Sequence, residues 1–271
     1  MTKLEQTLRQ RVAAGEKMLA PFVTAGYPNL PATAAILRAI DGLGLGCIEV
    51  GIPFSDPVAD GPTIQASFTA ALNGGLTVEH LFAELGRLTD LVTPRIAMVS
   101  FTIAYRWGVQ RFLECAAKAG FSGVLFADLP LGAEPEVGQL AEQAGLANIM
   151  LVAPTSPPAR RKQIAQASTG FIYYLSVAGI TGERRELPAD LPENVRQIKA
   201  ADPGKPVFVG FGIGRPEQVA QVTAVADGAI VGSAIVRRIS QAIESGQTDS
   251  PDKLADRVRQ YVAELCAGLK K

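Results

Sequence analysis

The sequence predicts an α/β fold, a single (β/α)₈ TIM barrel, on the basis of three observations. Eight short apolar segments recur along the chain, and most lack strict alternation of apolar and polar residues. Segments with apolar residues at helical spacing lie between them, and no linker-like or low-complexity stretch divides the 271 residues. Apolar strands that alternate with helices are typical of a parallel sheet covered on both faces, and about 250 residues suffice for one barrel. We therefore expect one domain over residues 1–271.

Each strand candidate is short and apolar, as expected for a strand that is buried on both faces. The candidates are Leu19–Thr24, Cys47–Val50, Ile96–Ser100, Gly123–Ala127, Ile149–Val152, Phe171–Leu175, Val207–Val209 and Ala229–Val231. The competing topology is an open doubly wound sheet, which normally carries a G-x-G-x-x-G fingerprint after its first strand. Here the first strand leads into TAGYP at residues 24–28, which does not match that fingerprint. The barrel is therefore favoured.

Helices are expected between the strands, where apolar residues recur every three or four positions and form stripes that pack on the barrel. The stripes are Ile36, Leu37 and Ile40; Leu81, Leu85 and Leu88; Val137, Leu140, Ala141 and Ala144; Val195 and Ile198; Val219 and Val222; and Leu254, Val258, Val262 and Leu265. The charged segment 1–17 is also helix-like.

Composition and charge argue against several classes of protein. The chain has 26 basic and 26 acidic residues, so it offers no electrostatic footprint for nucleic acid or an anionic membrane. No stretch approaches the ~18 apolar residues of a membrane span, and the charged N-terminus lacks the apolar run of a signal peptide. Cys47, Cys115 and Cys266 are far apart and His80 is the single histidine, so no metal site is expected. We expect a cytoplasmic metabolic protein with reduced thiols.

Two acidic residues mark the end of the second strand and the loop after it, where a TIM barrel places its active site. Glu49 lies between Ile48 and Val50 inside an apolar strand, and Asp60 follows on a proline-rich loop. Burial would raise the pKa of Glu49 toward the range useful for general acid–base catalysis. The residues alone leave other interpretations open. Glu49 could form a salt bridge with a helix on the outer face, and Asp60 could be a turn or helix-cap residue.

Glycine-rich loops after the last two strands indicate a phosphate site. They read VGFGIG at residues 209–214 and VGSAIV at residues 231–236, where Ser233 adds a hydroxyl donor. In TIM barrels these loops and a helix N-terminus commonly bind phosphate, because glycine lets backbone N–H groups approach the anion. The alternative is a pair of ordinary turns. The loop at residues 173–182, which runs into charged residues, is expected to be a mobile lid or a solvated surface loop.

The run IEVGIPFSDPVADGPTIQ at residues 48–65 resembles the signature of the tryptophan synthase α-subunit family. The similarity extends from about Leu4 to Ala267, and shorter runs support it: FVTAGYP (22–28), ADLP (127–130), APTSP (153–157), SVAGITG (176–182), GFGI (210–213) and DGAIVGSA (227–234). The resemblance implies a TIM barrel with an extra N-terminal helix. It also implies a lyase of L-tryptophan biosynthesis, which splits indole-3-glycerol phosphate by retro-aldol cleavage into indole and glyceraldehyde 3-phosphate.

The resemblance further implies roles for individual residues and a partner protein. Glu49 is expected to be the general acid and base, Asp60 to hold the indole N–H, and Tyr173 to lie near Glu49. The substrate-binding positions are expected to be Phe22 and Phe211 as walls of the indole pocket, Thr181 and Gly182 in a closing loop, and Gly182, Gly212, Gly232 and Ser233 at the phosphate. Family members usually form an α₂β₂ heterotetramer with a β subunit that holds pyridoxal phosphate, and no cofactor is expected on this chain.

One segment departs from the family pattern. After the third strand the family usually reads Tyr-x-Asn-Pro, whereas residues 101–108 read FTIAYRWG, with Ile103 and Ala104 in place of the polar residue and the proline. This loop faces the β subunit in the family, so we expect a missing hydrogen bond and a flexible alanine to weaken activation by the partner. Three other functions are left open. The chain could be a stand-alone indole-releasing lyase, or another phosphate-binding barrel, such as an isomerase or synthase that acts on a neighbouring indole or histidine substrate. It could also be a non-catalytic barrel that activates a partner subunit.

Overall fold

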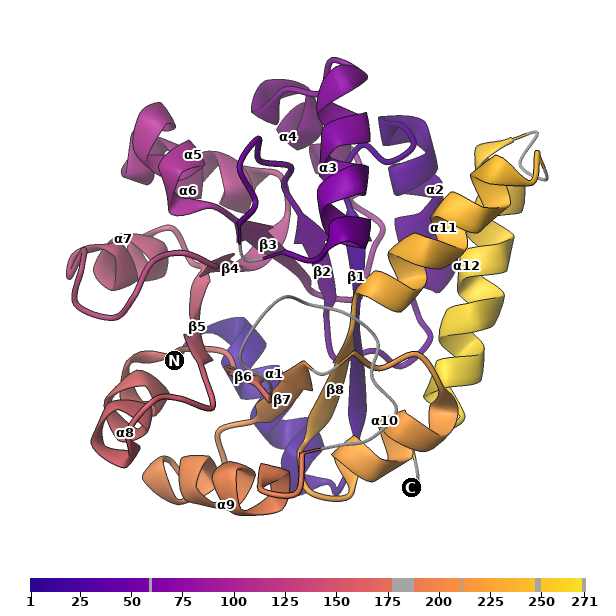
Figure 1. Cartoon of the computed structure of the whole chain (residues 1–271). Helices are drawn as coiled ribbons and strands as arrows, with labels where there is room; N and C mark the ends of the chain where they lie inside the picture. Colours follow the sequence, from indigo (N-terminus) through magenta and orange to yellow (C-terminus); the bar gives the residue numbers. More distant parts are fainter. Residues whose placement is uncertain (59, 177–187, 211, 247–249, 270–271) are drawn as a thin grey trace.

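Eight parallel strands close into a barrel in the computed structural model. They are β1 (Met18–Thr24), β2 (Ile48–Gly51), β3 (Arg95–Val99), β4 (Phe121–Phe126), β5 (Ala147–Val152), β6 (Ile172–Leu175), β7 (Val207–Gly210) and β8 (Gly228–Val231). Each strand pairs with the next along the chain, and β8 pairs with β1 (Figure 1). The structure describes residues 1–271 except 59, 177–187, 211, 247–249 and 270–271. The predicted TIM barrel is confirmed, with strand ends shifted by only one or two residues.

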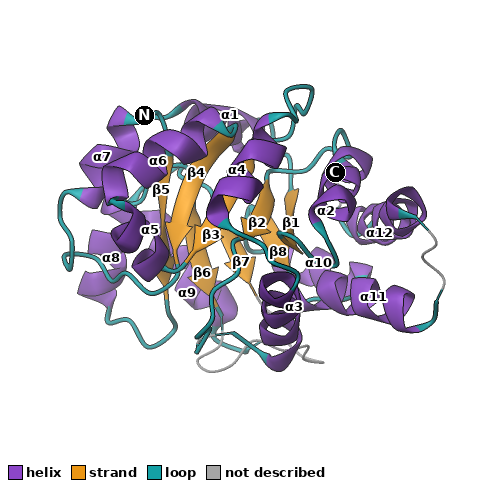
Figure 2. Cartoon of the chain, turned by 90° about the horizontal axis from the view of Figure 1, so that it is seen from above, coloured by secondary structure: helices purple, strands orange, loops and turns teal. Residues whose placement is uncertain are grey.

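Helices surround the strands on the outside of the barrel (Figure 2). In the described part of the chain they are α1 (Lys3–Ala13), α2 (Leu30–Ile40), α3 (Pro62–Asn73), α4 (Val78–Gly86), α5 (Phe101–Trp107), α6 (Val109–Lys118), α7 (Val137–Gln143), α8 (Pro158–Ala167), α9 (Leu191–Ala201), α10 (Pro216–Thr223), α11 (Ser233–Glu244) and α12 (Pro251–Cys266). Side-chain caps mark where several begin. Asn29 accepts from the N–H of Ala32 before α2 begins, and Ser250 accepts from the N–H of Lys253 at α12. The predicted apolar stripes lie on α2, α4, α7, α9, α10 and α12, except that Leu88 and Ala144 follow the ends of α4 and α7.

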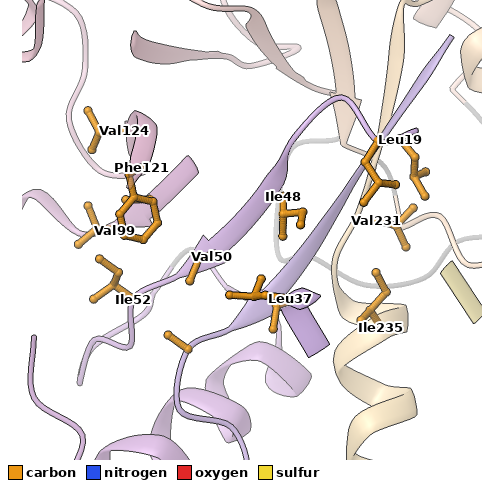
Figure 3. Close-up of a cluster of buried hydrophobic side chains, with 14 of the residues drawn as sticks. Leu19, Leu37, Ile48, Val50, Ile52, Val99, Phe121, Val124, Val231 and Ile235 are labelled. Carbon is orange, nitrogen blue, oxygen red and sulfur yellow. The ribbon is translucent and has the colours of Figure 1, made fainter. Parts of the chain in front are cut away.

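The strands are apolar along their length because both of their faces are buried. On the outer face, Val50 of β2 and Val231 of β8 pack in one cluster with Leu37 of α2 and Ile235 of α11 (Figure 3). On the inner face, a second cluster that includes Phe208 of β7 fills the barrel. Because successive side chains of a strand point to opposite faces, neighbouring residues of one strand lie in different clusters, one outside the barrel and one inside it.

Helix α1 covers the N-terminal end of the barrel. Leu8 packs with the apolar residues that fill the barrel interior. Glu5 is only 5% exposed, yet it accepts from the side chain of Arg9 at 2.9 Å and from the backbone N–H of Gly170 at 3.2 Å. Arg9 also forms an ion pair with Asp202 at 3.1 Å. These contacts fasten α1 to the segments that precede β6 and β7, and they confirm the extra N-terminal helix.

Segment 101–108 is not the flexible loop that the sequence suggested. Most of it forms α5, and Ser100 is the N-cap. Asp128, just after β4, accepts from the backbone N–H of Phe101 at 2.6 Å and from the hydroxyl of Ser100 at 2.6 Å. Ala104 is 0% exposed because it packs in the outer core. The expectation of a flexible alanine is therefore wrong, since a strong helix former lies in the middle of a capped helix.

Candidate active site

The described residues that were predicted for the site lie on the barrel strands and on the loops that follow them. Phe22 on β1 pairs in register with Glu49 on β2, and Tyr173 lies on β6. The loops after β7 and β8 carry Gly212 and Gly232. Because all eight strands are parallel, their C-terminal ends meet at one mouth of the barrel, where TIM-barrel enzymes place their chemistry.

Glu49 is a buried acid that lacks a partner among the residues that the structure describes. Its side chain is 0% exposed, and neither carboxylate oxygen has a hydrogen-bond partner among the described residues. Its neighbours Ile48 and Val50 face the outer core, so Glu49 faces the barrel interior and the alternative of an outer-face salt bridge is wrong. Burial raises the pKa of Glu49 from 4.5 to about 8, because the charged form is poorly solvated there. At neutral pH this carboxyl group holds a proton that it can donate.

Asp60 lies on the loop between β2 and α3, which a backbone turn and a glutamine hold in place. The N–H of Asp60 donates to the carbonyl of Pro57 at 3.0 Å. The side-chain amide of Gln65 donates to the carbonyls of Pro57 at 3.2 Å and of Asp60 at 2.8 Å. Gly61 is the N-cap of α3, so the alternative of Asp60 as its helix cap is wrong. Burial raises the pKa of Asp60 from 3.8 to about 6, which leaves the group largely ionised at neutral pH.

Tyr173 lies within electrostatic reach of both carboxyl groups. Its pKa is raised well above 10, first by burial and then by the negative charges of Glu49 and Asp60. The hydroxyl group therefore keeps its proton and can act as a hydrogen-bond donor. Its ring extends across β7, where a Cβ atom at Gly210 would lie 2.9 Å from the hydroxyl oxygen. The fold thus brings together the three residues for which a catalytic role was predicted.

The predicted phosphate site combines a glycine loop with the N-terminus of a helix. Helix α11 begins at Ser233, with Gly232 as its N-cap. The N–H groups in the first turn of a helix have no partner within it, and the helix dipole favours an anion there. Gly212, in the loop after β7, has a φ of 27°, in the left-handed region that favours glycine. Both loops therefore expose backbone that is suited to an anion.

Two side chains that sequence reasoning missed hold the loop after β7. Gln218 accepts from the N–H of Gly214 at 2.9 Å, and Tyr261 of α12 donates its hydroxyl to the carbonyl of Gly214 at 2.8 Å. The guanidinium of Arg238 on α11 lies over the ring of Tyr261, 4.7 Å from its centroid. Helices α11 and α12 are thereby linked to the loop that carries Gly212. Tyr261 lies 47 positions from Gly214 in the sequence, and no local pattern joins the two.

Apolar side chains line the mouth beside β1. Phe22 packs with Ile64 and Phe68 of α3 and with Val236 of α11, and Met98 of β3 contacts the same cluster. The role of Phe22 as a wall of the indole pocket stays a prediction. Three further predicted binding residues lie outside the described residues: Thr181, Gly182 and Phe211.

Metal-binding and membrane-spanning features were also sought in the described part of the chain. No group of three or more His, Cys, Asp or Glu side chains there could hold a metal ion. No helix there is long and apolar enough to cross a membrane. Burial and the charge of Glu49 raise the pKa of the Cys47 thiol well above 9, so this thiol is a packing residue of the barrel interior at neutral pH.

Fold and site together define an acid–base enzyme of the TIM-barrel class. Two carboxyl groups with raised but different pKa values share one mouth with a helix N-terminus that is suited to an anion. Within this class the chain belongs to the tryptophan synthase alpha chain family, whose model matches residues 8–266. It is a lyase of the tryptophan synthase α type, and the resemblance carried by residues 48–65 is confirmed.

Relatives and solved structures agree with this assignment over nearly the whole chain. The tryptophan synthase alpha chain of Rhodopirellula baltica is 38% identical, covering 100% of this chain and 98% of the relative. That of Gloeobacter violaceus is 41% identical, covering 96% and 90%. A structure of Mycobacterium tuberculosis tryptophan synthase has a TM-score of 0.88 at 33% identity, covering 100% and 99%. A mutant α-subunit from Pyrococcus furiosus has a TM-score of 0.81 at 33% identity, covering 92% and 98%.

Proposed function

We propose that the protein cleaves indole-3-glycerol phosphate into indole and glyceraldehyde 3-phosphate by acid–base catalysis at the mouth described above. Family membership supplies the reaction. The observation that supports Glu49 as its acid is a fully buried carboxyl group that has no hydrogen-bond partner in the part of the chain that the structure describes and has a pKa of about 8. Such a group is costly to bury, and it is protonated at the pH where the reaction needs a proton donor.

The first step protonates the substrate. The bond to be broken joins C3 of the indole ring to the glycerol phosphate side chain, and it breaks readily only when C3 carries a proton. Glu49 donates this proton, which leaves an indolenine cation. Asp60 is ionised at neutral pH because its pKa is about 6, and its carboxylate stabilises the positive charge that develops at the ring nitrogen.

The second step breaks the carbon–carbon bond. The Glu49 carboxylate left by the first step takes the proton of the side-chain hydroxyl group, and that carbon becomes the aldehyde. The electron pair of the broken bond returns to the ring, which neutralises the cation and releases indole. Glu49 ends the cycle protonated, so atoms and charge balance without an oxidant or a reductant. Tyr173 keeps its proton beside both carboxyl groups and serves as a hydrogen-bond donor in the pocket.

Substrate binding uses the remaining predicted residues. The phosphate binds to the backbone at Gly212 and Gly232 and to Ser233, where the α11 N-terminus favours an anion. Phe22 packs against the indole ring. Gly182 at the phosphate, Thr181 in a closing loop and Phe211 as a second wall belong to the same proposal, by family resemblance. Binding the remote phosphate helps to position the reacting end of the substrate.

We also propose that a tryptophan synthase β subunit docks on the rim formed by the loop after β2 and by α5. Val58 in that loop is 86% exposed and Tyr105 in α5 is 68% exposed, so each segment offers a large apolar side chain to a partner. The two segments follow neighbouring strands, β2 and β3. The same loop carries Asp60, so docking there would act on a catalytic group. Pyridoxal phosphate belongs to the β subunit in this proposal, and this chain needs no cofactor of its own.

Weaker activation by the β subunit stays a prediction, but it now rests on Ile103 alone and no longer on Ala104. Ala104 is buried within α5, so the ordering cost expected for a flexible residue does not arise. Ile103 cannot form the hydrogen bond of a polar side chain, and this is still expected to weaken activation, by about 1 kcal/mol. Mixing the chain with a β subunit and measuring indole release tests this. Full activation at ordinary affinity would show that isoleucine at position 103 is neutral, and no binding to any β subunit would favour a stand-alone lyase.

A direct assay of indole release from indole-3-glycerol phosphate tests the proposed function. The wild-type chain should release indole and glyceraldehyde 3-phosphate in equal amounts. A Glu49→Gln variant, folded as judged by circular dichroism, should be nearly inactive. Absence of indole release by the wild-type chain, alone and with a β subunit, would favour a non-catalytic barrel and would overturn the proposal.

A further inference from the structure

Gly51, the last residue of β2, faces the ring of Phe22. Gly51 lies two residues beyond Glu49, so it faces the same side of the strand, and it pairs in register with Thr24. A Cβ atom at Gly51 would lie 2.5 Å from Cε2 of Phe22 and closer still to Cζ. Carbon atoms do not approach so closely. The ring of Phe22 therefore occupies the space that any side chain at position 51 would need.

The backbone at Gly51 does not itself require glycine. Thirteen glycines of the described chain have a positive φ, and Gly51 is not among them. Alanine could therefore adopt this extended conformation without strain. What excludes a side chain at position 51 is contact with Phe22 and, at 3.3 Å, with Cε1 of Phe68.

The other sides of the Phe22 ring are already occupied. Ile64 and Phe68 of α3 and Val236 of α11 pack against it, and the ring is buried. On the β8 side, a Cβ atom at Gly232 would lie 3.6 Å from Cβ of Phe22, an ordinary contact distance. Tyr27 and Met98 contact the same cluster, so a ring displaced from β2 would have to push these neighbours aside or move toward Glu49, with which Phe22 pairs in register.

We propose that Gly51 is a positioning residue that sets the width of the indole pocket, because its missing side chain lets Phe22 lie against β2. The inference rests on the proposed function, in which Phe22 is a wall of that pocket. A methyl group at position 51 would drive the ring into the space for the indole half of the substrate. The phosphate half binds to the backbone at the N-terminus of α11 in that function, so we expect a methyl group at position 51 to affect it much less.

A double-mutant cycle on the full chain tests this, with Gly51→Ala and Phe22→Leu as the two changes. The probes are indole for the aromatic half of the substrate and glycerol 3-phosphate for the other half, both measured by calorimetry. Gly51→Ala should weaken indole binding about tenfold, the usual scale of overpacking, and should change glycerol 3-phosphate binding less than about twofold. In the Phe22→Leu background the same change should alter indole binding less than about twofold, since Leu lacks the ring atoms that clash.

A matched control is Gly138→Ala in α7, where the new Cβ atom would meet Asn148 Nδ2 at an ordinary 3.5 Å. This variant should bind both probes like the wild-type chain. An equal effect of Gly51→Ala in both backgrounds would overturn the proposal, as would an effect on glycerol 3-phosphate binding. If the Gly51→Ala variant does not fold, the double variant is the test: it should fold and bind indole like Phe22→Leu. A double variant that does not fold, or does not bind indole in this way, would also overturn the proposal.

The cycle measures binding of fragments and not turnover. A wild-type chain that binds indole but does not cleave indole-3-glycerol phosphate would contradict the proposed function and leave the cycle interpretable. A chain that cleaves the substrate but shows no coupling between positions 51 and 22 would contradict the inference alone.

Discussion

The two ends of the barrel treat a buried glutamate in opposite ways. At the N-terminal end, Glu5 is 5% exposed and accepts from Arg9 and from the N–H of Gly170. At the C-terminal end, Glu49 is 0% exposed and has no hydrogen-bond partner among the described residues. A buried acid costs stability unless it is paired. Within the described residues, the protein therefore pairs the acid at the N-terminal end and leaves without a partner the acid to which we assign catalysis.

Asp227, just before β8, extends the comparison. It is buried, forms an ion pair with Lys199 at 2.7 Å and accepts from the N–H of Val207 at 3.0 Å. Asp60 at the opposite end has a pKa raised to about 6 by burial. Stability and function therefore separate along the barrel axis, as is usual for TIM barrels, and the four predictions below test that separation.

The largest effect is expected at Glu49. Glu49→Gln keeps the shape of the side chain but removes the transferable proton, so turnover should fall roughly 10²–10⁴-fold, the usual contribution of a general acid or base. Steady-state kinetics on indole-3-glycerol phosphate measure it, and phosphate affinity should be unchanged. Glu5→Gln is the matched change at the other end, and it should lower thermal stability while leaving kcat near the wild-type value. Retention of more than half of wild-type turnover by Glu49→Gln would remove Glu49 from the mechanism.

A smaller loss of turnover is expected at Asp60. Asn at this position can still accept the indole N–H but cannot offset a full positive charge, so Asp60→Asn should lower kcat by about 10²–10³-fold. Binding of glycerol 3-phosphate should be unaffected, because the predicted phosphate site lies across the mouth on the loops after β7 and β8. Loss of phosphate binding in this variant would place Asp60 outside the indole pocket.

The pKa values predict how activity and stability depend on pH. The reaction needs Asp60 ionised and Glu49 protonated, so kcat/KM should follow a bell with limbs near the pKa values of about 6 and about 8. A raised folded-state pKa means that the folded state binds more protons, so Glu49 lowers the free energy of unfolding as pH rises from about 4.5 toward 8. Glu49→Gln should remove this slope and be more stable than wild type at pH 8, by on the order of a few kcal/mol. Urea denaturation at several pH values measures it, and identical slopes in the two proteins would contradict the burial of an acid at this position.

The smallest effect is expected at Gln65, which holds the loop of Asp60 through two backbone carbonyls. Gln65→Met keeps the length of the side chain but cannot donate, and about 1 kcal/mol for each of the two hydrogen bonds removed predicts a kcat that is lower by at most roughly 30-fold. KM for the phosphate-bearing substrate should change little. Gln65→Glu should be at least as impaired, because a carboxylate would face two carbonyl oxygens. A loss of thermal stability in Gln65→Met with no change in kcat would make Gln65 a structural residue only.

At segment 101–108, the local spacing of residues failed to predict the secondary structure. The departure from the family pattern at Ile103 and Ala104 stays a prediction, and the sequence did not predict a helix in this segment. The start of α5 has a local cap, Ser100, whose hydroxyl accepts from the N–H of Thr102 at 3.2 Å, and a distant partner, Asp128, which lies 27 positions away and accepts from the N–H of Phe101. Only the contact with Asp128 leaves no trace in the local spacing of residues. A helix of seven residues also shows too short a stripe to recognise.

The sequence by itself determined the barrel, because eight apolar runs separated by helical stripes have few other ways to bury both faces. It also determined that Asp60 lies at the C-terminal end of the barrel and that Glu49 lies on the strand before it, because the loop that follows a parallel strand always leaves the barrel at that end. Only the tertiary structure decided which side of β2 faces inward, because a strand that is apolar on both sides does not mark its interior face. It also decided the partners of Gln65, Tyr261 and Gly51, because these contacts depend on loops and helices packed against each other after the barrel has closed.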